Sequence, residues 1–593
     1  MSFPFLISAE AIVWSKGKKS LFLDENMSTL LEDPANLKKF YGDPQLTIAA
    51  VKKLKEKGFV VSNIGKFGIT FKGSRQSFRD YFKVEINVKD PASVTAFAAG
   101  NDGASKEPVK QFDPKNTDFA DLLARITLLQ PVKYNDGEDE SPNVKGINNT
   151  NFLTPEMIKQ HLQENPDNQL PNELSKFDAR EVTVAIADSG FYLEHPYFKK
   201  NYSFLQLEPK LLQSLKDDES KFDNNDHDTI VNNLKIKKKE LEVAIEDRSW
   251  ADSEVVVTPQ QKKDLLEKMG RLDKRIDLLK LQIDDLDFDR VKTEAGHWEN
   301  YKNTGHGTQV ITCLLSIVNN VKLILGYNVT NLLIDDLKEF VKIPDAPLSA
   351  KPNVYSISCD GGMTDRMIAT MSDNLTKGCI YVFAVGNAKS KMSDDIWKGL
   401  LGLDIILVGG AFWRVSGPNS PRELTASEYT RGKVIGKRKI PDICALSGQS
   451  KMPYLVLPVH KNSGWAELSR KKEDSDTVSC GEGWILVRGA SSMAAPQVAG
   501  VCALLKQRHH GITATEVKEI LNATSIKIKN GKTADDVKME DIGAGLVDLP
   551  KALSMASVKA ALLSEKGQLS EVQFKEAEKA CNEYLKGVKI WTD

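Results

Sequence analysis

The chain has 593 residues, of which 41% are hydrophobic and 27% are charged, a composition typical of soluble globular proteins. One compact core does not serve a chain of this length, so roughly two to four domains or large insertions are expected. The 80 Lys and Arg residues almost balance the 81 Asp and Glu residues. This balance argues against nucleic acid or an anionic membrane as the main partner.

Targeting signals and metal motifs are not evident in the sequence. The opening stretch, MSFPFLISAEAIVWSKGKKS, has neither the basic start nor the small-residue cleavage site of a secretory signal. No run approaches the ~20 apolar residues of a membrane-spanning helix. The seven cysteines show no CxxC pairs and no His/Cys metal spacing. The sequence therefore predicts a cytoplasmic protein with reduced thiols, no bound metal and no cofactor.

Residues 1–132 are expected to form a separate α+β domain. Strands are indicated by AEAIVWS, VVSNIGKFGITFKG and VEINV, and helices by DPQLTIAAVKKLKEKGF and SRQSFRDYFK, which together predict the order βαββαβ. A linker is expected over residues 133–174, and its acidic, Asn-rich first part over residues 133–151, KYNDGEDESPNVKGINNTN, is predicted to be exposed. Such a linker is a suitable site for proteolytic processing.

Asp188 is the first candidate for a catalytic residue. It ends a predicted buried strand over 182–187 and is followed by a Ser-Gly turn. Ligands usually bind at the carboxyl ends of strands in an α/β sheet. An aspartate in Asp-Ser-Gly is as often the cap of a turn as a catalytic group, so this residue alone leaves both roles open.

Residues 205–295 are expected to form a helical insertion. An apolar seam with alternating steps of four and three runs through its second half: Leu265, Met269, Leu272, Ile276, Leu279, Ile283 and Leu286. A shorter seam precedes it: Ile230, Leu234, Leu241 and Ile245. The two segments predict an antiparallel coiled-coil hairpin, either a structural decoration or a docking arm for a regulatory protein partner.

Two further motifs supply a histidine and a serine. His306 lies between glycines in NTGHGTQVITCLLSIV, at the entry to an apolar helical pattern, and is either a surface residue or a catalytic base. Ser491 and Ser492 precede the helical pattern of RGASSMAAPQVAGVCALL, where a serine can cap the helix or act as a nucleophile. A nucleophilic serine needs a base, and the base needs a carboxylate that fixes its tautomer.

The motifs ADSG, GHGT and SMAAPQVAG, in this order, resemble those of the subtilisin-like serine peptidases, the subtilases. The resemblance implies a catalytic triad of Asp188, His306 and Ser492, because the family's nucleophile stands four residues before the motif proline, here Pro496. Ser491 then occupies the position of the family's usual threonine.

The same resemblance assigns the other site residues. The strand in GCIYVFAVGNAKS ends in Gly-Asn, which implies Asn387 as a donor to the oxyanion, with a turn asparagine as the alternative. VYSISCDGG resembles the strand beside which family substrates lie as extended peptides. The implied substrate-binding residues are Ser358, Gly361, Gly362, Val385 and Gly386.

The expected fold class is α/β, with a subtilisin-like parallel sheet flanked by helices. Strand-like runs alternate with helical patterns and indicate this class independently of the resemblance: 182–187, 353–358, 380–385 and 405–409. The peptidase domain is expected over residues 175–560, with a helical extension over 561–593. In the N-terminal region, FGITFKGSRQSFRDYF resembles the activation prodomain of kumamolisin-type peptidases.

Together these features predict a serine endopeptidase that cleaves protein or peptide substrates through an acyl-enzyme and is regulated by its N-terminal domain or by a partner. A catalytically inactive subtilase-fold binding or scaffold protein is the alternative, and the four retained active-site residues favour the enzyme. For the N-terminal domain, an inhibitory or chaperone prodomain, a partner-binding module and a packing domain all remain open.

Overall fold

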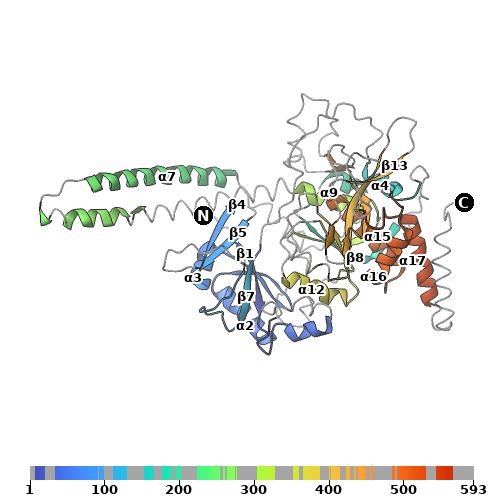
Figure 1. Cartoon of the computed structure of the whole chain (residues 1–593), viewed down its shortest axis with the longest axis horizontal. Helices are drawn as coiled ribbons and strands as arrows, with labels where there is room; N and C mark the ends of the chain where they lie inside the picture. Colours follow the sequence, from blue (N-terminus) through green and yellow to red (C-terminus); the bar gives the residue numbers. More distant parts are fainter. Residues whose placement is uncertain are drawn as a thin grey trace, which may run out of the picture.

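The computed structural model contains an N-terminal domain and a larger α/β domain, which lie next to each other in Figure 1. None of the described helices is long and apolar enough to cross a membrane. The structure describes residues 7–20, 34–90, 93–98, 111–129, 153–165, 177–188, 191, 195–201, 224–253, 258–260, 263–273, 275–276, 304–318, 320–327, 352–358, 365–386, 400, 402–414, 422–427, 433–435, 438–448, 455–458, 484–487, 491–528 and 542–564.

The N-terminal domain is an antiparallel sheet that two helices cover on one face. The order of its strands is β2 (Val60–Ile64), β3 (Gly68–Gly73), β1 (Ile7–Val13), β7 (Leu123–Leu128) and β6 (Gln111–Phe112). Side chains alternate between the faces of a strand. The side chains on one face of β1, with Ala9 and Ala11 at the centre, pack in a common core with α2 (Pro44–Glu56) and α3 (Arg75–Phe82).

The predicted order βαββαβ is confirmed for the first five elements, but the last strand of the sheet is a different one. VEINV lies in β4 (Val84–Asp90), which pairs with β5 (Ser93–Ala98) in a separate two-stranded sheet. The place beside β1 is taken by β7, from later in the chain. Periodicity indicates that a segment is a strand, whereas its partner depends on contacts distant in sequence.

The larger domain is built on a mostly parallel sheet, as predicted. The order of its strands is β13 (Glu423–Ala426), β12 (Ile406–Arg414), β11 (Ile380–Ala384), β10 (Val354–Ile357), β8 (Asp178–Asp188) and β9 (Asn320–Tyr327). β16 (Ile443–Leu446) also pairs with β12, in parallel, whereas β13 pairs with β12 in the antiparallel direction. The four predicted strands are confirmed, and β9 adds an edge strand that the sequence analysis did not identify.

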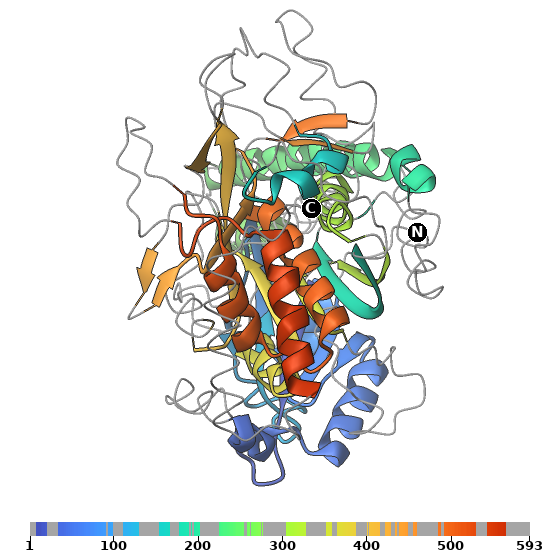
Figure 2. The same ribbon diagram turned by 90° about the vertical axis from the view of Figure 1, so that its right-hand side faces the viewer.

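Successive residues of the central strands point to opposite faces of this sheet. On β11, Val382 packs in one core with α9 (Thr304–Leu315) and α15 (Ser491–Arg508), whereas Phe383 packs in another with α12 (Asp365–Leu375). Two further helices, drawn in orange and red in Figure 2, complete this face: α17 (Leu549–Ser564) packs on α15, and α16 (Ala514–Thr524) packs on α17. Burial on both faces explains why these strands are continuous apolar runs.

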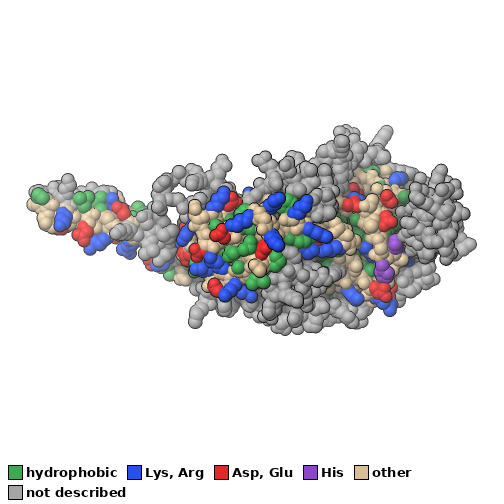
Figure 3. Space-filling model, turned by 90° about the horizontal axis from the view of Figure 1, so that it is seen from below, with side chains coloured by type: hydrophobic (Ala, Val, Ile, Leu, Met, Phe, Trp, Pro, Cys, Tyr) green, Lys and Arg blue, Asp and Glu red, His purple; other side chains and the backbone are tan. Residues whose placement is uncertain are grey.

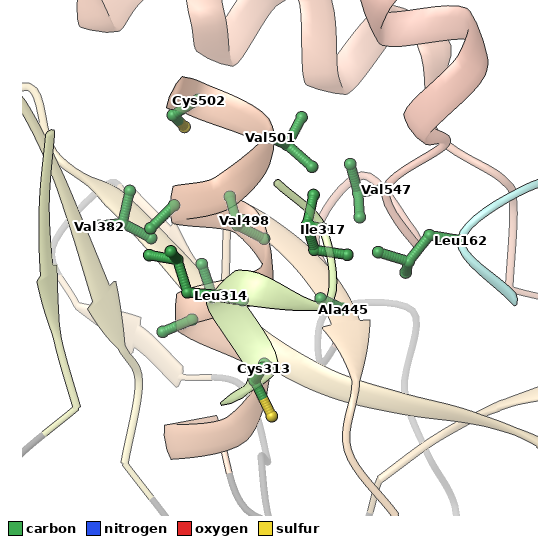
Figure 4. Close-up of a cluster of buried hydrophobic side chains, with 14 of the residues drawn as sticks. Leu162, Cys313, Leu314, Ile317, Val382, Ala445, Val498, Val501, Cys502 and Val547 are labelled. Carbon is green, nitrogen blue, oxygen red and sulfur yellow. The ribbon is translucent and has the colours of Figure 1, made fainter. Parts of the chain in front are cut away.

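α15 runs through the centre of the larger domain, and its residues 493–506 are all buried. Its contact with α9 depends on Gly500, because a Cβ atom there would lie 2.9 Å from the Ile317 Cβ and 3.2 Å from the Leu314 carbonyl oxygen. Figure 4 shows Val498 of α15 and Leu314 of α9 within the same cluster. A larger side chain at position 500 would push the two helices apart.

α12 is enclosed between the two domains, and its residues 366–374 are all buried. Ile12 of β1 and Phe67, in the turn between β2 and β3, join Met367 of α12 in one apolar cluster, and the short helix η1 (Pro34–Phe40) contributes to it as well. In Figure 1, α12 (yellow) lies between the blue domain and the large sheet. The N-terminal domain therefore covers the outer face of a helix that belongs to the larger domain.

Two pairs of opposite charge cross this domain contact. Arg366 Nη1 donates to Glu10 Oε1 at 3.2 Å, and Lys66 Nζ donates to Asp373 Oδ2 at 2.8 Å. The Tyr41 hydroxyl donates to the other oxygen of the Asp373 carboxylate at 2.6 Å. Burial opposes ionisation of Asp373, but the hydrogen bonds from Lys66 and Tyr41 hold the pKa of its carboxyl below the ordinary value.

The insertion contains a helical hairpin that projects from the rest of the structure in Figures 1 and 3. α7 (Asn224–Ser253) contacts a second helical stretch, since Arg248 Nε donates to Asp273 Oδ1 at 2.8 Å and Ala244 packs on Ile276. These contacts make the two helices antiparallel. Ile245 is 49% exposed, so the predicted seam is wrong at this residue, where Ala244 faces inward instead.

A supercoiled hairpin stays a prediction. Contacts along the seam are described as far as Ile276, and the predicted seam residues Leu279, Ile283 and Leu286 lie outside the described residues.

The face of the molecule shown in Figure 3 carries Lys and Arg side chains interspersed with acidic and apolar ones.

Two predicted boundaries differ from the observed elements. Within the predicted linker, α4 (Pro155–His161) buries Ile158, and Leu162 after it is also buried in the core of the larger domain. The linker expected over 133–174 is therefore interrupted by a packed segment. At the other end, α17 continues past residue 560 to Ser564, and the residues after it lie outside the described part of the chain.

Candidate active site

The predicted site residues that the structure describes gather at the carboxyl edge of the parallel sheet. Asp188 is the last residue of β8, Ser358 directly follows β10, and Gly386 comes just after β11. The N-terminal turns of α9 and α15 bring His306 and Ser492 to the same edge. Strand carboxyl ends together with helix N termini form the usual ligand-binding crevice of such folds.

Asp188 and His306, 118 residues apart in the sequence, form a buried hydrogen bond of 2.8 Å between Oδ1 and Nδ1. The aspartate is fully buried and the histidine is 7% exposed. An ionised carboxylate only accepts hydrogen bonds, so the imidazole proton is placed on Nδ1. Nε2 of the neutral ring is then an acceptor, which is the arrangement that a catalytic base requires.

Ser492 stands in the first turn of α15 and is partly exposed, unlike its neighbour in the sequence. Its hydroxyl donates to the carbonyl oxygen of Ser358 at 3.2 Å, and the Ser358 hydroxyl donates back to the Ser492 carbonyl oxygen at 3.0 Å. The Ser492 hydroxyl is thus engaged with the backbone of Ser358 in this structure.

Ser491 is buried completely and has a different environment. Its hydroxyl donates to the carbonyl oxygen of Gly386 at 3.0 Å, which ties α15 to the end of β11. Gly386 has a φ of 84°, a left-handed conformation that glycine adopts without steric cost. The adjacent serines therefore differ in environment: Ser491 is buried and bonded to the end of β11, whereas Ser492 is partly exposed.

The structure places only part of the predicted substrate-binding set. Val385 is buried, and its N–H donates to the carbonyl oxygen of Val408 on the neighbouring strand at 3.1 Å. Asn387, Gly361 and Gly362 lie outside the described residues.

Among the residues that the structure describes, the cysteine thiols on the elements that build this site are poor candidates for the nucleophile. Three of them lie on elements that build the site: Cys313 on α9, Cys502 on α15 and Cys444 on β16. Burial raises the pKa of each thiol, to about 12 for Cys444. Because only the thiolate is strongly nucleophilic, these groups are inert at neutral pH. Among the described residues, no group of three or more His, Cys, Asp or Glu could hold a metal ion.

Gln497 is a structural contributor to the site that motif reading alone did not reveal. Its fully buried amide accepts from the Leu446 N–H at 3.1 Å, and donates to the carbonyl oxygens of Leu446 at 2.6 Å and Met493 at 2.8 Å. These bonds fasten the first turn of α15 to β16. A polar amide within an otherwise apolar helix is the signal in the sequence.

The sequence matches the subtilase family, peptidase S8, over residues 179–545. Because this match spans more than half of the chain, the protein belongs to the subtilases and is a subtilisin-like serine peptidase. A comparison with curated proteins found no match.

Among solved structures, the epidermin leader peptide processing serine protease of Staphylococcus aureus aligns with a TM-score of 0.40 at 13% identity, over 93% of this chain and 99% of that one. Fervidolysin of Fervidobacterium pennivorans, a keratinolytic enzyme related to subtilisin, aligns with a TM-score of 0.41 at 13% identity, over 93% of this chain and 61% of that one.

Proposed function

We propose that the protein is an endopeptidase in which Asp188, His306 and Ser492 form a catalytic triad. The observation that carries this proposal is the buried 2.8 Å hydrogen bond between Asp188 and His306, beside the helix N terminus that presents Ser492. His306 Nε2 takes the proton of Ser492 as its Oγ attacks the scissile carbonyl carbon. Asp188 fixes the tautomer and stabilises the imidazolium that forms.

The remaining steps follow from the same groups. The oxyanion of the tetrahedral intermediate receives hydrogen bonds from the Ser492 N–H at the start of α15 and from the side chain of Asn387. His306 then gives its proton to the leaving amine, and the acyl-enzyme at Ser492 remains. A water molecule, deprotonated by His306, attacks this ester; as the bond from the acyl carbon to Ser492 Oγ breaks, His306 returns the proton to Oγ and the acid product leaves. The chemistry uses no cofactor.

The substrate in this proposal is an extended peptide. It lies beside the end of β10, where main-chain groups of Ser358, Gly361 and Gly362 bind it, and it approaches Val385 and Gly386 at the end of β11. Main-chain hydrogen bonds fix the peptide's direction, whereas its side chains occupy pockets of unassigned preference.

We propose in addition that the N-terminal domain, residues 1–132, restrains the peptidase domain, residues 175–560, as an activation prodomain of the kumamolisin type would. Support comes from its docking on α12, the helix that follows Ser358 in the chain. Cleavage in the linker, residues 133–174, is the proposed activating step. A cytoplasmic location is proposed as well, on the basis of the free thiols of Cys313, Cys379, Cys444 and Cys502.

Hydrolysis of a fluorogenic peptide pool tests this function on the full chain. One sample stays intact, and the other is folded first and then cut at a site engineered within residues 133–151. We expect hydrolysis that a fluorophosphonate blocks, with a higher rate in the cut sample. No hydrolysis in either sample would contradict the peptidase mechanism. Equal rates would contradict only the restraint by the N-terminal domain.

The hairpin within residues 205–295 is proposed as the docking arm of a regulatory protein. It projects from the body, and four large apolar side chains on it are at least 47% exposed: Ile236, Val243, Ile245 and Leu266. Exposed apolar side chains on a projecting element are common where a partner binds.

Replacing residues 225–290 by a short Gly/Ser linker separates docking from catalysis. We expect kcat/KM for a small peptide to stay within about twofold of the wild type, because Asp188 and His306 are held by the sheet and α9. Binding of the regulatory partner should be lost. If the shortened protein keeps its circular dichroism spectrum but no longer hydrolyses the peptide, the hairpin belongs to the active site instead.

A further inference from the structure

The first turn of α15 lacks one of its regular hydrogen bonds, at the residue that the proposed function makes the nucleophile. In an α-helix, a carbonyl oxygen accepts from the N–H four residues later. For Ser492 that residue is Pro496, which lies inside the helix and has no N–H. The proline ring also crowds the carbonyl four residues before it and tilts that carbonyl away from the helix axis.

Ser358 supplies a donor for this carbonyl. Its hydroxyl lies 3.0 Å from the Ser492 carbonyl oxygen, across a contact between residues 134 positions apart in the chain. Ser358 itself is 3% exposed and directly follows β10, so its backbone is held by the central sheet. A carbonyl oxygen that loses its hydrogen-bond donor at such a largely buried contact costs free energy.

The neighbouring carbonyl of the same turn is held in a similar way. Gln497 Nε2 donates to the Met493 carbonyl oxygen at 2.8 Å while its amide is fastened to Leu446 on β16. Ser358, which follows β10, thus holds the carbonyl of Ser492. Gln497, which is bonded to β16, holds the next carbonyl, that of Met493. These contacts add to the regular helix in fixing the backbone of Ser492.

We propose that Ser358 is a positioning residue for the nucleophile: its hydroxyl replaces the helical donor that Pro496 lacks and so fixes the backbone from which the Ser492 side chain projects. The inference rests on the proposed function, since it assumes that Ser492 attacks. It gives Ser358 a role beyond binding substrate through its main chain. The expected consequence is an effect on the reactivity of Ser492 itself, seen even with a probe too small to occupy a peptide-binding cleft.

The test combines Ser358→Ala and Pro496→Ala in the full chain, in the form, intact or cut within residues 133–151, that reacts with a small fluorophosphonate. In the chain that keeps Pro496, Ser358→Ala should slow phosphonylation of Ser492 by about 10- to 100-fold. This is the range expected when a carbonyl acceptor in a folded protein loses its hydrogen-bond donor. With peptide substrates, kcat should fall while KM stays within about twofold. Alanine at position 496 restores an N–H to the helix. In that background, Ser358→Ala should cost less than about threefold.

Ser316→Ala is the matched control, because this buried hydroxyl also donates to a carbonyl near a helix end, that of Cys313 at 2.7 Å, away from the proposed triad. It should leave the phosphonylation rate unchanged and shift the thermal midpoint about as much as Ser358→Ala does.

Three results would overturn the inference while the proposed function stands: a normal phosphonylation rate with a raised KM in Ser358→Ala, a loss that Pro496→Ala fails to reduce, or a loss that merely follows the fraction of unfolded protein. A wild-type protein that the probe never labels would overturn the proposed function, and the inference with it.

Discussion

Ser492→Ala should abolish peptide hydrolysis, whereas Ser491→Ala should retain a measurable fraction of the wild-type rate. Removal of the nucleophile leaves the residual rate that binding and the oxyanion donors provide, a loss on the order of a millionfold when measured in subtilisin. Ser491 acts only through its hydrogen bond to the Gly386 carbonyl oxygen, so its loss should cost about tenfold or less.

The two rates are compared by kcat/KM on one fluorogenic peptide, with each variant checked for wild-type thermal stability. The opposite ranking, with Ser491→Ala inactive and Ser492→Ala active, would show that the adjacent serines have been assigned the wrong way round. It would also contradict the inference that Ser491, because it is buried, has a purely structural role.

Arg366→Met should destabilise the protein by about 3–5 kcal/mol, because it leaves the buried carboxylate of Glu10 without its cation. The double variant Glu10→Leu/Arg366→Met should recover most of this loss, since replacing both members of a buried pair by apolar groups is often nearly neutral. Chemical denaturation measures both free energies of unfolding. A double variant as unstable as Arg366→Met would contradict the pairing as the origin of the effect.

An exposed ion pair of the same domain provides the control. Lys18 and Asp121 lie 2.9 Å apart, and their side chains are 65% and 90% exposed. Lys18→Met should change the free energy of unfolding by less than about 1 kcal/mol. If Lys18→Met lowers the free energy of unfolding as much as Arg366→Met does, the buried pair between the domains makes no special contribution to stability.

The sequence was most informative where chemistry restricts the choice of side chain. Asp188, His306 and Ser492 could be proposed as a triad from the sequence because a triad needs these three residue types, each at a strand or helix end with its own small-residue context. The spacing to Pro496 singled out Ser492, and the burial of Ser491 supports that choice. The parallel sheet was equally accessible, because strands buried on both faces are continuous apolar runs.

Contacts between distant segments were not accessible in the same way. Glu10 lies in an apolar strand, and its burial makes sense only once Arg366, 356 residues later, is known to cover that face of the sheet. For the same reason VEINV was identified as a strand while its pairing was not. In the hairpin, seven-residue periodicity wrongly assigned Ile245 rather than Ala244 to the inner face, because a small residue can face a close helix contact as well as a large one.

The central claim, that Ser492 is the nucleophile activated by the pair of Asp188 and His306, is tested most directly by mapping the site of covalent modification. The full chain is treated with a fluorophosphonate probe, intact and after cleavage within residues 133–151, and the labelled peptide is sequenced by tandem mass spectrometry. We expect one label, on Ser492, which disappears in His306→Ala. A label on Ser491, or no label in either form, would contradict the account.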